Sequence, residues 1–91
     1  MARVKRAYGT HLYLIDAGEV CKVGRSADVP RRFAEVCRGT PFSNARLVAT
    51  FPDAGFCEPW VMRALAGYER RGEWFRCTIA DALAAVGAVL V

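Results

Sequence analysis

The sequence lacks the residue patterns of metal knuckles, export signals and membrane spans. Its four cysteines stand 16, 20 and 20 positions apart and it holds one histidine, so the close spacing of zinc ligands is absent. The basic N-terminus is not followed by an apolar stretch, and no apolar run is long enough to cross a bilayer. We therefore expect a cytoplasmic protein with reduced cysteines and no membrane partner.

The length and composition are those of one small domain. The chain has 91 residues, of which 54% are hydrophobic, and this is enough to build a single core. We expect one domain over residues 1–91, in which residues 1–9 form a loose lead-in. Each cysteine lies among apolar neighbours, so all four are expected to be small buried hydrophobes. Trp60 and Trp74 lie in element-like stretches and are assigned to packing rather than to base stacking.

An excess of positive charge is the first indication of a partner. The formal net charge is +4. Such a charge favours a polyanion such as nucleic acid, although ordinary solubility charge would give the same composition. The basic residues gather in the first forty positions, at Arg3, Lys5, Arg6, Lys22, Arg25, Arg31, Arg32 and Arg38.

A hairpin is predicted within this basic segment. His11–Ile15 and Val20–Gly24 have strand composition and are joined by a polar turn. A pairing in which residue numbers add to 35 places Tyr13 opposite Lys22. That arrangement is either an ordinary cross-strand pair or one in which the ammonium lowers the phenol pKa and makes Tyr13 a general base. His11 shares a face with Tyr13 and is either a candidate for proton transfer or an ordinary strand residue.

Two predicted helices each carry a charged residue on a face that should turn inward. The first begins after the N-cap Asp28, ends at Arg38 and carries Arg32 at the edge of its apolar stripe. That stripe consists of Val29, Phe33, Val36 and Cys37. The second begins at or before Glu58, which heads its apolar stripe, and ends near Gly67. Because a buried charge needs a partner, Arg32 and Glu58 either pair with each other, extend to solvent at the edges of their stripes, or line a cleft.

The remaining segments complete an α+β chain. Arg46–Phe51 is a third strand, and Glu73–Cys77 is a short strand or extended piece. Thr78 and Asp81 form a capping pattern that opens a final helix. The apolar residues of that helix are Ile79, Leu83, Val86 and Leu90. This order predicts the α+β class, with a small central mixed or antiparallel sheet of three to four strands flanked by three helices.

The tyrosine and the two charged stripe residues indicate one chemistry when taken together. A phenolate can accept a proton, an arginine can hold a phosphate, and a glutamate can bind a hard divalent cation through oxygen. With Tyr13, Arg32 and Glu58 in those roles, the chain would hydrolyse a phosphodiester bond.

At these residues the chain resembles the GIY-YIG nuclease family over about residues 10–77. His11-Leu12-Tyr13 stands at the GIY element, and Lys22-Val23-Gly24 stands at the YIG element. Gly72-Glu73-Trp74-Phe75 is similar to the GEWF ending of a short subgroup found in phage and bacterial proteins. Each motif alone is short, and the resemblance depends on their order and spacing together.

The resemblance implies a small mixed sheet with flanking helices, a single Mg²⁺ or Mn²⁺ ion and cleavage of DNA. Arg32 fits the family's helix arginine, which stabilises the transition-state phosphate, and Glu58 fits its metal-binding glutamate. Tyr13 takes the place of the base, with Lys22 beside it in the catalytic set. The substrate-binding positions are Gly24, where the backbone could be approached closely, Arg25 and Arg31.

The chain departs from the family pattern at positions that handle protons. Lys22 replaces the second tyrosine, Val36 replaces a helix histidine, and Met62 stands where the subgroup often has a histidine. Two other functions are therefore weighed against the nuclease. One is a catalytically degenerate domain that binds nucleic acid without cutting it. The other is a small protein-interaction module that forms a homodimer through the apolar last helix, Ile79–Val91.

Overall fold

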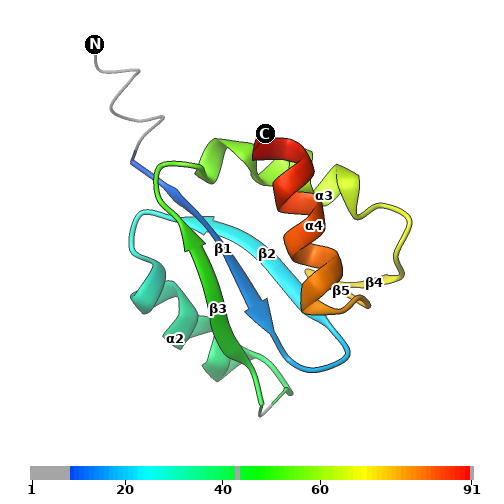
Figure 1. Ribbon diagram of the computed structural model, residues 1–91. Helices are drawn as coiled ribbons and strands as arrows, with labels where there is room; N and C mark the ends of the chain where they lie inside the picture. Colours follow the sequence, from blue (N-terminus) through cyan, green and yellow to red (C-terminus); the bar gives the residue numbers. More distant parts are fainter. Residues whose placement is uncertain (1–8, 43, 91) are drawn as a thin grey trace.

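Strands and helices follow one another along most of the chain (Figure 1). The computed structural model describes residues 9–42 and 44–90, so all of the expected lead-in except Gly9 lies outside the described residues. No helix in that part of the chain is long and apolar enough to span a membrane. The elements in order are β1 (His11–Asp16), β2 (Cys21–Ser26), α2 (Val29–Gly39), β3 (Arg46–Phe51), the 3₁₀ turn η1 (Gly55–Cys57), α3 (Glu58–Ala64), β4 (Arg70–Arg71), β5 (Trp74–Phe75) and α4 (Ile79–Leu90).

The strands form one sheet, and the predicted α+β class is confirmed. The strand order is β3-β1-β2-β5-β4, and each strand pair in the described residues is antiparallel. The sheet has five strands rather than three to four, because residues 70–75 form a hairpin where one extended piece was expected. Gly72 has a φ of 60° in the tight turn of this hairpin, a conformation that glycine adopts without strain. The hairpin places Trp74 beside Lys22 of β2.

The register between β1 and β2 differs by two positions from the predicted one. Tyr13 lies opposite Gly24, so the expected direct pairing with Lys22 is wrong. The reason is a turn centred one residue further along the chain, which is closed by the Ala17 N–H donating to the Val20 carbonyl at 2.9 Å. A shift of two positions keeps every side chain on its face of the sheet. Tyr13 and Lys22 therefore still share one face, as diagonal neighbours.

Helices cover both faces of the sheet (Figure 1). Because side chains alternate along a strand, β1 sends Leu12 and Leu14 to one face and Tyr13 and Ile15 to the other. The first face packs against α3 and α4 in the larger core cluster. The second face packs against α2, whose Val29 completes a smaller buried cluster. Tyr13 therefore lies in the smaller core, beneath α2.

The predicted starts of α2 and α4 are confirmed, whereas α3 is shorter than predicted. The Asp28 carboxylate caps α2 by accepting the Arg31 N–H at 3.2 Å. Thr78 and Asp81 exchange two hydrogen bonds of 3.1 Å at the start of α4. Helix α3 ends at Ala64 because its last turn tightens, as in the 3.1 Å bond from the Ala66 N–H to the Arg63 carbonyl.

Four residues that were expected inside lie at the surface. Cys37 is exposed, whereas the other three cysteines are buried. Trp60 is 54% exposed, with the Arg63 guanidinium 5.5 Å from its ring centre. Leu83 and Leu90 are also exposed, because α4 packs on the core through other residues, Ala82, Ala85 and Val86. Nothing in the described residues supports the expected homodimer through this helix.

Replacement of Thr78 by alanine should lower the free energy of unfolding by about 1 kcal/mol, because α4 loses the hydroxyl oxygen that accepts the Asp81 N–H. The matched control is Thr78→Ser, which keeps this oxygen and should unfold like the wild-type protein. Urea denaturation followed by circular dichroism measures all three proteins. An alanine variant as stable as the wild type would contradict the capping role.

Candidate functional site

Tyr13 is the buried centre of the candidate site. Its side chain is 1% exposed and lies across the backbone of Gly24 on the neighbouring strand. A Cβ atom at position 24 would overlap the Cζ and hydroxyl oxygen of Tyr13 and would lie 2.8 Å from its Cε2. The tyrosine ring thus occupies the space that a side chain on β2 would fill. The close approach expected at Gly24 is made by this ring.

Burial raises the pKa of the Tyr13 phenol above its ordinary value of 10.0. A hydrogen bond from Arg32 and the charge of its guanidinium oppose this rise in pKa. The negative charges of Glu73 and Glu58 reinforce it. The expectation that Lys22 would lower this pKa is wrong, because its ammonium is paired elsewhere. At neutral pH, Tyr13 is therefore a protonated phenol.

Lys22 of β2 forms an ion pair with Glu73, the residue that precedes its strand partner Trp74. The lysine side chain is 6% exposed and the glutamate side chain is 65% exposed. A nearly buried ammonium needs such a partner. The hydrogen bond from Lys22 is the main cause that lowers the pKa of the Glu73 carboxyl. Glu73 was not predicted as a site residue, although its position inside the Gly72–Phe75 motif was a signal that could have identified it.

Arg32 reaches toward Tyr13 from helix α2. Its guanidinium acts on the pKa of the phenol and lies 3.3 Å from the Glu35 carboxylate on the same helix. The side chain is 47% exposed, which places it at the edge of the helix stripe. A half-exposed guanidinium can exchange a carboxylate partner for another anion, because such pairs contribute only about 0–1 kcal/mol to stability.

Glu58 approaches the site as the first residue of α3, from the opposite side of the sheet to α2. Its carboxylate lies 3.6 Å from the Nε of Arg25 on β2, and the glutamate side chain is 23% exposed. The alternative in which Arg32 and Glu58 pair with each other is wrong, because each is bound to another residue. Glu58 is nevertheless close enough to Tyr13 for its charge to raise the phenol pKa.

His11 and Arg31 have other contacts. The His11 Nδ1 accepts the Asp53 N–H at 2.9 Å. Asp53 has a φ of 60°, so the histidine stabilises a turn with an uncommon backbone conformation. Arg31 is 78% exposed at its side chain and lies 3.6 Å from Glu35. The structure thus gives His11 a role in the fold and leaves Arg31 as a surface cation of α2.

A hollow of about 380 Å³ opens beside this cluster. The charged residues that line the hollow are Lys22, Arg32, Glu35 and Glu73. Val36 lines it too, at the position where the resembled family has a histidine. The two cations are each paired with a carboxylate, and the half-exposed Arg32 is the one that an anion entering the hollow can contact.

The acidic side chains near Tyr13 offer a metal ion few ligands. Within residues 9–42 and 44–90, no three His, Cys, Asp or Glu side chains are grouped so that they could hold a metal ion. Glu58 can offer one partly exposed carboxylate. A single carboxylate fits Mg²⁺, which keeps several waters and commonly takes one or two protein carboxylates together with substrate phosphate.

Replacement of Gly24 by alanine should lower the free energy of unfolding by about 1–3 kcal/mol, because the new methyl group must displace the buried Tyr13 ring. The matched control is Gly39→Ala near the end of α2, where a Cβ would meet nothing within 4 Å. Thermal and urea unfolding compare the two variants. Equal stabilities would contradict the packing of Tyr13 on Gly24.

Comparison with known proteins identifies the family of the chain. Residues 10–90 match the T5orf172 domain, which is a nuclease-like domain. No curated protein and no solved structure gives a significant match. Because the matched residues span nearly the whole chain, this protein belongs to the T5orf172 domain family.

Proposed function

We propose that this domain is a divalent-metal-dependent endonuclease of the GIY-YIG type that hydrolyses DNA phosphodiester bonds. The observation that carries the proposal is a buried Tyr13 phenol, packed on Gly24, whose pKa responds to both the Arg32 guanidinium and the Glu58 carboxylate. These groups come from β1, α2 and α3, which lie apart in the sequence. The nuclease-like family and the order of the sequence motifs support the same reaction class.

In the proposed reaction, a water oxygen forms a bond to the phosphorus while the bond to the leaving sugar oxygen breaks. The Tyr13 phenolate takes the proton from the attacking water, and the leaving oxygen takes a proton from solvent. Arg32 binds the non-bridging phosphate oxygens, whose negative charge grows in the transition state. The exchange of Glu35 for phosphate is inexpensive because both side chains are partly exposed. The Lys22–Glu73 ion pair holds the lysine ammonium in place on β2, the strand beside the phenol.

Glu58 is the residue that would hold the Mg²⁺ or Mn²⁺ ion. When bound, the ion supplies Lewis-acid stabilisation of the phosphate oxygens. The Nε of Arg25 lies 3.6 Å from the Glu58 carboxylate, and the arginine side chain is 53% exposed. Arg25 would then be free to contact a backbone phosphate once Glu58 is engaged, which matches the substrate-binding role proposed for it.

A domain that binds DNA without cutting it is the second candidate function. The observation that favours it is Val36, an aliphatic side chain in the hollow beside Arg32. The resembled family has a histidine there, so a group that could move protons is missing at this point of the site. The exposed cations Arg25, Arg31 and Arg32 would still bind phosphates.

The variants Arg32→Ala and Glu58→Ala should each lower the cleavage rate of plasmid DNA in Mg²⁺ by at least about 100-fold, because each removes a charge that faces the reacting phosphate. The fold should survive, since both side chains are partly exposed. The matched control is Arg38→Ala, which removes an exposed cation from the last turn of α2 and should cleave like the wild type. Equal nicking by all the proteins would reject the site, and binding without cleavage by the wild type would favour the second candidate.

The cleavage rate should rise about tenfold per pH unit from pH 6.5 to pH 9, because only the phenolate accepts a proton and the pKa of Tyr13 lies above 10.0. Stability should change in the opposite direction at higher pH. A phenol whose pKa is raised in the folded protein holds its proton more tightly there, so stability falls as pH rises above 10.0.

Single-turnover cleavage over this pH range measures the profile, with Tyr13→Phe as the comparison. The phenylalanine variant should lose both the rate and its rise with pH. A wild-type profile that levels off near pH 7, or a phenylalanine variant with an unchanged profile, would exclude Tyr13 as the base.

A further inference from the structure

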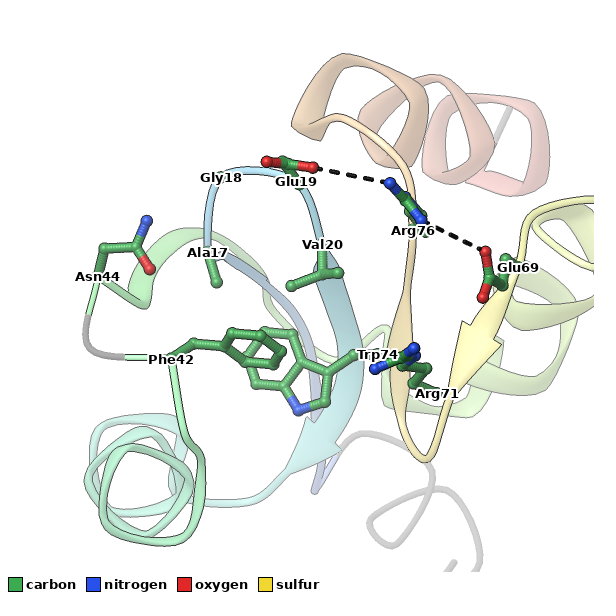
Figure 2. Close-up of a pocket in the computed structure, with 10 residues that line it drawn as sticks. All are labelled: Ala17, Gly18, Glu19, Val20, Phe42, Asn44, Glu69, Arg71, Trp74 and Arg76. Carbon is green, nitrogen blue, oxygen red and sulfur yellow. Dashed lines mark ion pairs between the residues drawn. The ribbon is translucent and has the colours of Figure 1, made fainter.

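A second hollow adjoins the candidate site at Trp74 (Figure 2). Its volume is about 440 Å³. The turn between β1 and β2 forms one wall, and the β4–β5 hairpin forms the other. Among the described residues, Trp74 is the single side chain that lines both hollows. A space of this size is within the range of small-ligand sites. A ligand bound in it would lie next to the hollow that Arg32 lines.

The interior of this second hollow is aromatic. Figure 2 shows the rings of Phe42 and Trp74 together inside it. Their centroids are 5.0 Å apart and their planes are inclined by 64°, so the rings meet edge to face and do not stack on each other. Both residues are only partly buried. An additional flat ring could therefore stack on one aromatic face and meet the edge of the other.

The charged side chains that line the hollow have no net charge. Arg76 lies between Glu19 at 3.9 Å and Glu69 at 3.6 Å, and Figure 2 shows these pairs along the rim. Arg71 also lines the hollow and forms no ion pair within the described part of the chain. With two arginines and two glutamates, the lining suits an uncharged ring inside and an anion near Arg71. The Asn44 amide, which comes from the connection between α2 and β3, also lines the hollow and can donate to and accept from a polar ring edge.

Strand pairing places the aromatic ring between two cations. Trp74 lies opposite Lys22 of β2 and opposite Arg71 of β4. Residues directly opposite in an antiparallel pair project from the same face, so Lys22, Trp74 and Arg71 form a row across the sheet. Because Lys22 is nearly buried and paired with Glu73, Arg71 and Trp74 are the cation and the ring of this row that a DNA strand can reach. Single-strand binding sites combine such groups: basic side chains follow the phosphates and aromatic side chains stack on the bases.

We propose that the Phe42–Trp74 hollow binds one unpaired nucleobase of a DNA strand whose neighbouring phosphate lies in the candidate site. The inference rests on the proposed function because it takes DNA as the ligand. It adds that the substrate has an unpaired nucleotide next to the cleaved bond. Trp74 is then a substrate-binding residue as well as a packing residue, and Arg71 contacts the phosphate on the far side of the base.

The test uses the fluorescence of Trp74 in the Trp60→Phe protein, which leaves Trp74 as the one tryptophan of the chain. EDTA is present, so binding is measured without cleavage. The protein is titrated with an oligodeoxyadenylate strand, an abasic deoxyribose-phosphate strand of the same length, a blunt duplex and deoxyadenosine monophosphate. The adenylate strand should quench Trp74 and bind about 5–100-fold more tightly than the abasic strand, which is the usual effect of stacking one base. The duplex should behave like the abasic strand.

Two variants in the same protein separate stacking from charge. Phe42→Leu should remove most of the advantage of the adenylate strand, whereas Arg71→Ala should weaken the adenylate and abasic strands by the same factor. The matched control is Phe56→Leu, a phenylalanine that is 53% exposed and does not line the hollow; it should bind like its parent. Circular dichroism spectra verify that each variant is folded.

Equal affinity for the adenylate and abasic strands, or an unchanged preference in Phe42→Leu, would overturn the inference. Binding of the mononucleotide as tightly as the strand would also overturn it, because the hollow would then be a site for free nucleotides. The outcome is separable from the proposed function. Cleavage in Mg²⁺ without base-dependent binding would leave the nuclease standing alone, and base-dependent binding without cleavage would leave only the base site.

Discussion

The packing of the Tyr13 ring on Gly24 is the contact on which the site depends. Tyr13 comes from β1, an interior strand of the sheet, and is nearly inaccessible, yet the half-exposed Arg32 guanidinium acts on the pKa of its phenol. It can do so because β2 has no side chain at position 24. The same contact places the phenol within the influence of Glu58, which belongs to a helix on the other side of the sheet. Gly24 thus leaves room for a phenol whose pKa responds to groups on both sides of the sheet.

Each cation around the phenol is held by a carboxylate in the free protein. Lys22 is paired with Glu73, Arg25 with Glu58, and Arg32 with a glutamate on its own helix. The two arginine pairs are partly exposed and therefore weak, so a phosphate can replace them at low cost. The lysine pair is different, because its ammonium is almost fully buried. The proposed substrate would rearrange the arginine pairs and leave the lysine pair in place.

The sequence predicted the elements better than it predicted their contacts. Arg46–Phe51 and the capped starts of α2 and α4 follow from alternation and from local capping chemistry, which are properties of neighbouring residues. The β1–β2 register was wrong because it depends on the backbone conformation of the turn, and a two-position error leaves the pattern of faces unchanged. The spacing of residues along the chain predicts neither how deeply a side chain is buried nor which distant residue pairs with it. The role of Glu73 and the rise in the Tyr13 pKa were missed for this reason.

In the proposed nuclease, a DNA phosphate binds beside Tyr13, Arg32 and Glu58. The most direct test is a crystal structure of the Tyr13→Phe variant bound to DNA in Mg²⁺, since this variant should bind the substrate without cleaving it. A backbone phosphate should lie within hydrogen-bonding distance of the Arg32 guanidinium, on the side of the site that Glu58 faces. DNA bound along β3 or α4, with no phosphate near Arg32, would contradict it.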